Sequence, residues 1–324
     1  MPITIDDVHR ARERLRPHIS PTPLRRYAAL DEAVGRGITV WVKHENHLPT
    51  GAFKARNAMS AMSRLDPASR ARGVVAATRG NHGQGLAWAG ERLGVPVTIC
   101  VPLGNNPDKN AAIVGYGARL VEEGRDYDES VKVAERLVRD EGLTLIHSTN
   151  NDDVVAGAST LALEMLEERP DLEAIVVAVG GGSQAVGCIT MARALAPALR
   201  VYGVQAEEAD AIFEAWHRGE PVTKPSANTF ADGLATRSTY ASTFGILREG
   251  LAGFVSVSER ERAAAIRLLL RTPHNLVEGA GAAGLAGLVK LGDTLAGKRV
   301  GIILSGANID LATLARVLTG DLSS

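Results

Sequence analysis

Short runs rich in β-branched residues alternate with longer helical stretches along nearly the whole chain, and this alternation limits the fold most. The strand-like runs are residues 38–43, 73–77, 95–101, 144–147, 174–179, 201–205 and 299–304. Between them lie stretches rich in Ala, Leu and Arg whose apolar residues recur with a helical period, such as residues 130–140 and 159–168. Strands that alternate with helices form βα units and a mainly parallel sheet. The sequence therefore predicts an α/β protein, and its length allows two open, twisted, mainly parallel sheets flanked by helices.

Composition narrows the classes of protein to which the chain can belong. With 45% hydrophobic residues and 34 glycines among 324 residues, it fits a compact α/β enzyme of one large or two moderate domains. Its 36 basic and 37 acidic residues nearly cancel, so we expect no nucleic-acid partner. No apolar stretch is long enough to span a bilayer, and the charged N-terminal segment is unlike a signal peptide. Cys100 and Cys188 lie in apolar surroundings, which favours buried thiols in a reducing cytoplasm.

Lys54 is the first candidate for a reactive residue. It follows Phe53 in the run Thr-Gly-Ala-Phe-Lys-Ala-Arg-Asn-Ala, residues 50–58, at the expected start of a helix. A lysine in a dry pocket can lose its charge and become a nucleophilic amine. Taken alone, the residue is better explained as a solvated lysine on a helix surface, so the interpretation depends on the loops downstream.

Two of these loops are suited to binding anions. Residues 78–84, Thr-Arg-Gly-Asn-His-Gly-Gln, follow a strand-like run and precede a helical stretch, and residues 180–183, Gly-Gly-Gly-Ser, do the same. A loop that enters a helix presents free N–H groups and the positive end of the helix dipole, which suits a carboxylate or a phosphate. A tight glycine turn with helix capping is the alternative at both places. A further loop, Ser-Gly-Ala-Asn at 305–308, ends the last strand-like run.

Taken in this order, the four segments resemble the fold-type II pyridoxal-phosphate enzymes, and most closely the serine/threonine dehydratase family. The family patterns are Ser-Phe-Lys-x-Arg-Gly-Ala, Ser-x-Gly-Asn-His-x-Gln, a tetraglycine loop and Ser-Gly-Gly-Asn, and the resemblance covers nearly the whole chain. The positions at which this chain departs from the patterns are Ala52, Asn57, Arg79, Ser183 and Ala307. All of these except Arg79 exchange small or polar residues for one another.

The resemblance implies a fold and a domain division. The fold is that of the tryptophan synthase β-subunit, in which a small domain is inserted into a larger one. The large, cofactor-binding domain is then expected to comprise residues 1–47 and 149–324, and the small domain residues 48–148. The active site is expected in the cleft between them, and a homo-oligomer, a dimer, is expected as the assembly.

The resemblance also implies roles for individual residues, with pyridoxal 5′-phosphate as the cofactor. Lys54 is the implied catalytic residue, which binds the cofactor aldehyde as a Schiff base and, once freed by the substrate amine, acts as the base at Cα. The residues implied in cofactor binding are Phe53, Lys54, Asn81, Gly180, Gly181, Gly182, Ser183 and Ser305. The residues implied in substrate binding are Thr78, Arg79, Gly80, Asn81, His82 and Gln84. Ser305 can hydrogen-bond an unprotonated ring nitrogen, which favours quick β-elimination; a capping serine is the alternative.

The implied activity is that of an ammonia-lyase, which converts a β-hydroxy-α-amino acid into a 2-oxo acid and ammonia, with L-threonine and L-serine as the default substrates. One alternative is a dehydratase for 3-hydroxyaspartate or phenylserine. Others are a serine racemase-type isomerase and a β-replacement synthase on the same scaffold. A protein of another class, a non-catalytic phosphate- or nucleotide-binding protein, would use the glycine loop alone.

Many relatives in this family bind a divalent cation through the pattern Glu-x-x-x-Ala-x-Asp after a strand. This chain has Gln205, Ala209 and Ala211 at the three positions, so both carboxylates of the pattern are replaced. Hard cations need several oxygen ligands, and we therefore expect no metal site there.

Arg79 is the largest departure from the family patterns. Racemases of the family have a serine at this position, whereas an arginine stays protonated and is a poor proton shuttle. Its guanidinium could bind the α-carboxylate of the substrate, or a second acidic group as in 3-hydroxyaspartate. Alternatively, it points out of the cleft and pairs with an acidic residue on the surface.

Overall fold

Two sheets organise the computed structural model, which describes residues 3–321. The larger sheet has the order β1 (Leu24–Arg26), β2 (Thr39–Lys43), β10 (Arg299–Ile303), β7 (Ala174–Ala178), β8 (Arg200–Ala206) and β9 (Leu251–Val257). The smaller sheet has the order β5 (Arg119–Glu122), β4 (Val97–Val101), β3 (Val74–Ala77) and β6 (Thr144–Leu145). Every pairing is parallel except that of β1 with β2. The predicted fold class is confirmed.

Both sheets are buried on both faces, as the continuous apolar runs predicted. In β7, Val176 contributes to one core cluster and Ile175 and Val177 to another, on the opposite face. In β3, Val74 and Val75 likewise belong to separate clusters. Successive side chains of a strand point to opposite faces, so helices must cover each face of each sheet.

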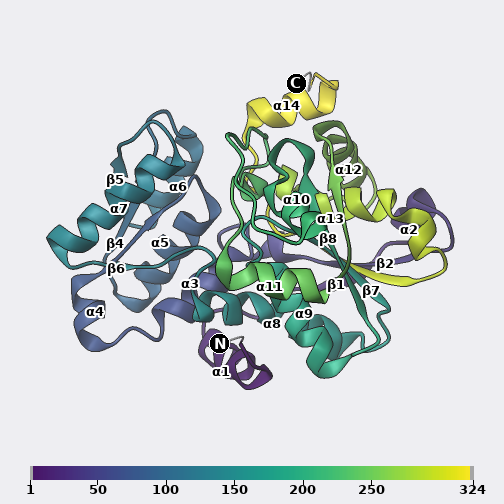
Figure 1. Ribbon diagram of the computed structural model, residues 1–324, viewed down its shortest axis with the longest axis horizontal. Helices are drawn as coiled ribbons and strands as arrows, with labels where there is room; N and C mark the ends of the chain where they lie inside the picture. Colours follow the sequence, from purple (N-terminus) through teal and green to yellow (C-terminus); the bar gives the residue numbers. More distant parts are fainter. Residues whose placement is uncertain (1–2, 322–324) are drawn as a thin grey trace.

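Helices supply this cover in two lobes (Figure 1). One face of the larger sheet packs against α2 (Ala28–Val34), α12 (Glu259–Arg271), α13 (Gly279–Lys290) and α14 (Leu311–Thr319). The other face packs against α1 (Ile5–Leu15), α8 (Asp152–Glu168), α9 (Ser183–Leu195), α10 (Ala211–Arg218) and α11 (Ala241–Gly250). The smaller sheet lies between α3 (Lys54–Met62), α5 (Asn81–Leu93) and α6 (Pro107–Gly115) on one side and α7 (Tyr127–Glu141) on the other. The remaining α-helix of the small lobe is α4 (Pro67–Arg72).

The sequence analysis found seven of these strands but did not identify β1, β5 and β9. The first has only three residues, and β5 is an edge strand with no buried side chain. The third, β9, reads Leu-Ala-Gly-Phe-Val-Ser-Val and carries a partly apolar pattern with β-branched residues at its end. The signal for this strand was therefore present in the sequence.

The helices differ in how they begin. Asp126 caps α7 and Asn151 caps α8, each through a side chain that accepts a backbone hydrogen bond. By contrast, α5 begins after Gly80 and α9 after Gly182, without a side-chain cap. The free N–H groups at these two N-termini are therefore available for other partners.

A buried ion cluster joins the two lobes where α3 packs against α8. The guanidinium of Arg56 is bound by Glu45 at 2.7 Å and by Glu164 at 2.6 Å, and Lys43 also binds Glu164.

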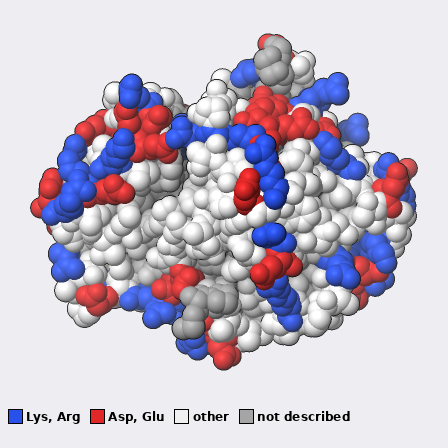
Figure 2. Space-filling model, in the orientation of Figure 1, with Lys and Arg blue, Asp and Glu red and all other residues white. Residues whose placement is uncertain are grey.

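The strands of the smaller sheet all lie between residues 74 and 145, whereas the domain limits at 48 and 148 stay a prediction. Within residues 3–321, no helix combines the length and the apolar character that crossing a membrane requires. On the face drawn in Figure 2, acidic and basic side chains are intermixed, and the surface is hollowed between the lobes.

Candidate active site

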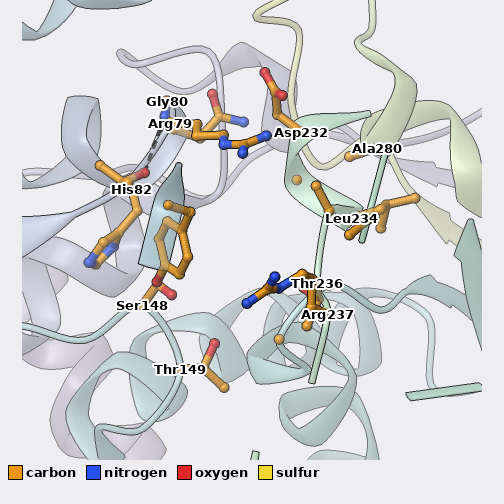
Figure 3. A pocket seen from close by; sticks show the side chains of 18 of the residues that line it. Arg79, Gly80, His82, Ser148, Thr149, Asp232, Leu234, Thr236, Arg237 and Ala280 are labelled. Atoms are coloured by element: carbon orange, nitrogen blue, oxygen red, sulfur yellow. Dashed lines mark hydrogen bonds between the residues drawn. The ribbon is translucent and has the colours of Figure 1, made fainter. Parts of the chain in front are cut away.

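A cavity of about 560 Å³ lies between the lobes, where the carboxyl ends of β3, β7 and β10 meet the first residues of α3, α5 and α9 (Figure 3). This is the usual position of ligands in open parallel sheets, because the loops there emerge on one side. All of the predicted site residues except Gln84 line the cavity. Residues far apart in the sequence thus meet at one place.

Lys54 is the first residue of α3 and is anchored by its neighbours. The N–H of Phe53 donates to the carbonyl of Ser305 at 3.0 Å, which ties the start of α3 to the end of β10. The Lys54 Nζ lies 3.3 Å from the carbonyl oxygen of Ser148 and 4.9 Å from the centroid of the Phe53 ring. Because burial disfavours the ammonium form, the pKa of Lys54 falls to about 8. The free amine is therefore accessible near neutral pH.

The glycine loop before α9 leaves no room for side chains. A Cβ at Gly180 would collide with the carbonyl of Gly233, and one at Gly181 would collide with Oγ1 of Thr149. Gly182 has a φ of 104°, a conformation that favours glycine. The first backbone bond of the helix runs from Val186 N–H to the Gly182 carbonyl. The N–H groups at the start of α9 are thus open to an anion such as phosphate.

The loop before α5 forms a second place of this kind. Gly80 donates its N–H to Oγ1 of Thr78 at 3.1 Å, and Gln84 N–H donates to the Gly80 carbonyl at 3.1 Å. The preceding amides at the start of α5 have no intrahelical partner. His82 donates its Nε2–H to the Ile146 carbonyl at 2.9 Å, and burial lowers its pKa to about 3, so the ring is neutral. The start of α5 can therefore bind a carboxylate through backbone N–H groups, with no need for a charged side chain.

Asn81 connects this loop to residues from the large lobe. Its Nδ2 donates to Oε1 of Glu278 at 2.6 Å, and its Oδ1 accepts from Nδ2 of Asn308 at 2.7 Å. Gln84 is buried behind Asn81 and accepts from the same Asn308 amide at 3.3 Å. Burial raises the pKa of Glu278 to about 7. The sequence analysis did not assign a role to Asn308, although the 305–308 segment was singled out.

Arg79 lines the cavity and is half-buried. Its Nε is buried without a hydrogen-bond partner, and among the described residues no carboxylate lies within 4 Å of its guanidinium. The structure thus places the side chain inside the cleft, and the surface ion pair considered above is not formed.

Two ion pairs cross the mouth of the cavity and were missed by the sequence analysis. Lys109 on α6 pairs with Asp232, and Arg237 pairs with Asp128 on α7. Asp232 belongs to the segment Ala-Asp-Gly-Leu-Ala at 231–235, whose central glycine is a signal for a turn. The pairing of residues more than a hundred positions apart has no signal in a single sequence.

The carboxylates near the family's cation pattern point to different partners. Glu207 pairs with Lys290 at 3.2 Å, and Glu208 with the buried Arg262 at 2.8 Å. Gln205 accepts a hydrogen bond at Oε1 from the N–H of Phe213 at 2.8 Å. Within residues 3–321, no three His, Cys, Asp or Glu side chains are grouped to hold a metal. The lack of a metal site stays a prediction.

Comparison with known proteins places these features in a family. Residues 15–306 match the model of the family described as pyridoxal-phosphate dependent enzyme. The chain is 35% identical to an L-threonine ammonia-lyase of Thermotoga maritima, over 98% of this chain and 78% of the relative. It is 34% identical to an L-threo-3-hydroxyaspartate ammonia-lyase of Saccharomyces cerevisiae, over 98% of this chain and 97% of the relative. The solved structure of maize serine racemase is similar with a TM-score of 0.93 and 28% identity, covering 99% of this chain and 98% of that one.

Proposed function

Because the chain belongs to the family of pyridoxal-phosphate-dependent enzymes, we propose that it is an ammonia-lyase that acts on a β-hydroxy-α-amino acid. The products are a 2-oxo acid and ammonia. The observation that carries the proposal is the meeting, in one cavity, of the Lys54 amine and the uncapped N-termini of α5 and α9. One amine and two anion sites are what an enzyme of this chemistry needs.

The residues of the cavity fit the cofactor. The cradle formed by Gly180 and Gly181, where there is no room for a Cβ, and the open N-terminus of α9 suit the phosphate group. Phe53, Asn81 and Ser305 line the same cavity. Phe53 would pack against the cofactor ring, and Asn81 and Ser305 would hydrogen-bond the polar atoms of the ring. The bound cofactor supplies an aldehyde for an amine and a conjugated ring that accepts electron density from the bonds at Cα.

Different groups of the protein would then bind the substrate, remove its Cα proton and contact the cofactor ring. The free N–H groups at the start of α5 bind the α-carboxylate of the substrate and fix its orientation. Lys54, whose pKa is lowered to about 8 by burial, takes the proton from Cα as the general base. The neutral hydroxyl of Ser305 does not hold a ring nitrogen protonated as a carboxylate would, which favours prompt loss of the β-hydroxyl.

Racemisation is the competing activity, because a solved relative is a serine racemase. It needs a second acid or base on the face of Cα opposite Lys54. Arg79 occupies the position that the racemase pattern gives to serine, and a guanidinium is a poor proton shuttle. The site therefore favours elimination.

We also propose that the protein forms a homo-oligomer, which analytical ultracentrifugation tests.

The test is an assay of the purified, cofactor-loaded protein against serine, threonine, 3-hydroxyaspartate and phenylserine. We expect equimolar release of 2-oxo acid and ammonia from at least one of them. Conversion only to the opposite enantiomer would show a racemase. Cofactor binding without any turnover would show a binding protein.

A further inference from the structure

Arg79 is the one cationic side chain in the cavity lining that neither has a counter-ion nor belongs to the proposed chemistry, among the described residues. The other charged groups of the lining are engaged as follows: Lys109 with Asp232, Arg237 with Asp128, Asp126 with the N–H of Glu129, and Glu278 with Asn81. Lys54 is reserved for the cofactor. Apart from Lys54, Arg79 is thus the cation of the described cavity lining that has no carboxylate within 4 Å.

One nitrogen of this side chain is buried without a partner. The Arg79 side chain extends into the space facing the 232–237 segment (Figure 3), and its Nε is buried without a hydrogen bond. A guanidinium cannot deprotonate to relieve this cost, and a buried polar group without a partner is unfavourable. Its planar fork fits a carboxylate with two parallel hydrogen bonds.

The α-carboxylate of the substrate does not need Arg79. The start of α5 already offers its free N–H groups, beginning at Asn81, and the helix dipole favours an anion there. Arg79 lies only two residues before Asn81. The carbon of a carboxylate on Cβ is two carbon–carbon bonds from Cα, so a residue beside the α-carboxylate site is within reach of it.

Resting on the ammonia-lyase function proposed above, we infer that Arg79 is a specificity-determining residue. It binds the side-chain carboxylate of an acidic β-hydroxy-α-amino acid, such as a 3-hydroxyaspartate. In this reaction the Cα–H and Cβ–O bonds break with loss of water, and water then displaces ammonia to leave a 2-oxo dicarboxylic acid. A neutral side chain such as the methyl group of threonine would leave the guanidinium unpaired.

The first experiment compares kcat/KM for both diastereomers of 3-hydroxyaspartate with kcat/KM for threonine. The wild type is expected to prefer an acidic substrate. In Arg79→Gln the acidic-to-neutral ratio should fall on the order of a hundredfold, the loss expected for two charge-assisted hydrogen bonds. Arg79→Lys keeps the charge but lacks the planar guanidinium. Its acidic-to-neutral ratio should therefore lie between the ratios of the wild type and of Arg79→Gln. Arg92→Gln, which removes an exposed arginine near the end of α5 and outside the cavity, should leave the ratio unchanged.

The second experiment measures inhibition without turnover. Succinate should compete with the substrate in the wild type, and its inhibition constant should rise on the order of a hundredfold in Arg79→Gln. Butyrate, which has one carboxylate and the same number of carbons, should be affected little by the substitution. Equal effects on both acids would show that Arg79 binds the α-carboxylate and would overturn the inference.

The outcomes separate this inference from the function on which it rests. Turnover of threonine or serine in preference to 3-hydroxyaspartate would leave the ammonia-lyase proposal intact and overturn the role of Arg79. An equal fall of kcat/KM for all substrates in Arg79→Gln would also overturn it. The absence of 2-oxo acid from every substrate, with cofactor bound, would instead overturn the proposed function.

Discussion

The side-chain amide of Asn81 donates a hydrogen bond of 2.6 Å to Oε1 of Glu278, and so joins the first residue of α5 in the small lobe to the N-cap of α13 in the large lobe. The carboxyl group is buried, which raises its pKa from the ordinary 4.5 to about 7, against the opposing effects of Lys109 and of the Asn81 hydrogen bond. The contact across the cleft therefore depends on pH.

Glu278→Gln should remove this pH dependence. Between pH 4.5 and 7 the folded protein binds more protons than the unfolded chain, so the free energy of unfolding falls as the pH rises through this window. The glutamine oxygen still accepts from Asn81 but never ionises. We expect the variant to gain on the order of 3 kcal/mol over the wild type above pH 7, and to lose this gain toward pH 4.5. Denaturant unfolding from pH 4.5 to 8 measures the difference, and a constant difference at all pH values would refute the role of Glu278.

The rate of cofactor loading should follow the titration of Lys54. Only the unprotonated amine attacks the aldehyde, and burial lowers the pKa from 10.5 to about 8. The loading rate, followed by absorbance, should therefore rise with a midpoint near pH 8, whereas a free lysine derivative would show its midpoint above pH 10. A midpoint above pH 10 for the protein would contradict the burial of the amine.

Gly181→Val should weaken cofactor binding more than it weakens the fold. The new side chain would meet Thr149 and close the cradle at the start of α9. The dissociation constant for the cofactor should rise on the order of tenfold or more. Gly115→Val is the control, because a Cβ at Gly115 meets no atom within 4 Å. If both variants bind the cofactor alike, the glycine loop is only a turn.

The main features of the fold could be predicted from the sequence because strands buried on both faces carry continuous apolar runs, as in β7. The uncapped starts of α5 and α9 could also be predicted, since glycine loops after strands mark them. Contacts across the cleft could not. Nothing local to Asp128 or Arg237 indicates that they meet, and the orientation of Arg79 is decided by neighbours that only the tertiary structure brings near.

Chelation should change neither the melting temperature nor the activity. Gln205 is engaged by the N–H of Phe213, and Glu208 by Arg262, so the oxygens near the family's cation pattern have other partners. Melting curves with and without EDTA, followed by addition of Mg²⁺ or Ca²⁺, check this expectation. A fall in the melting temperature with EDTA that Mg²⁺ or Ca²⁺ reverses would reveal a cation site built from other oxygens.

The identity of the cofactor-binding amine tests the account most directly. The cofactor-loaded protein is reduced with borohydride, digested and mapped by mass spectrometry, with Lys54→Ala as the control. The lysines that compete with Lys54 are engaged in ion pairs: Lys43 is buried against Glu164, and Lys109, which lines the same cavity, pairs with Asp232. We predict the reduced cofactor on Lys54 alone, with no label and no 2-oxo acid release in Lys54→Ala. A label on Lys43 or Lys109, or full activity in Lys54→Ala, would contradict the account.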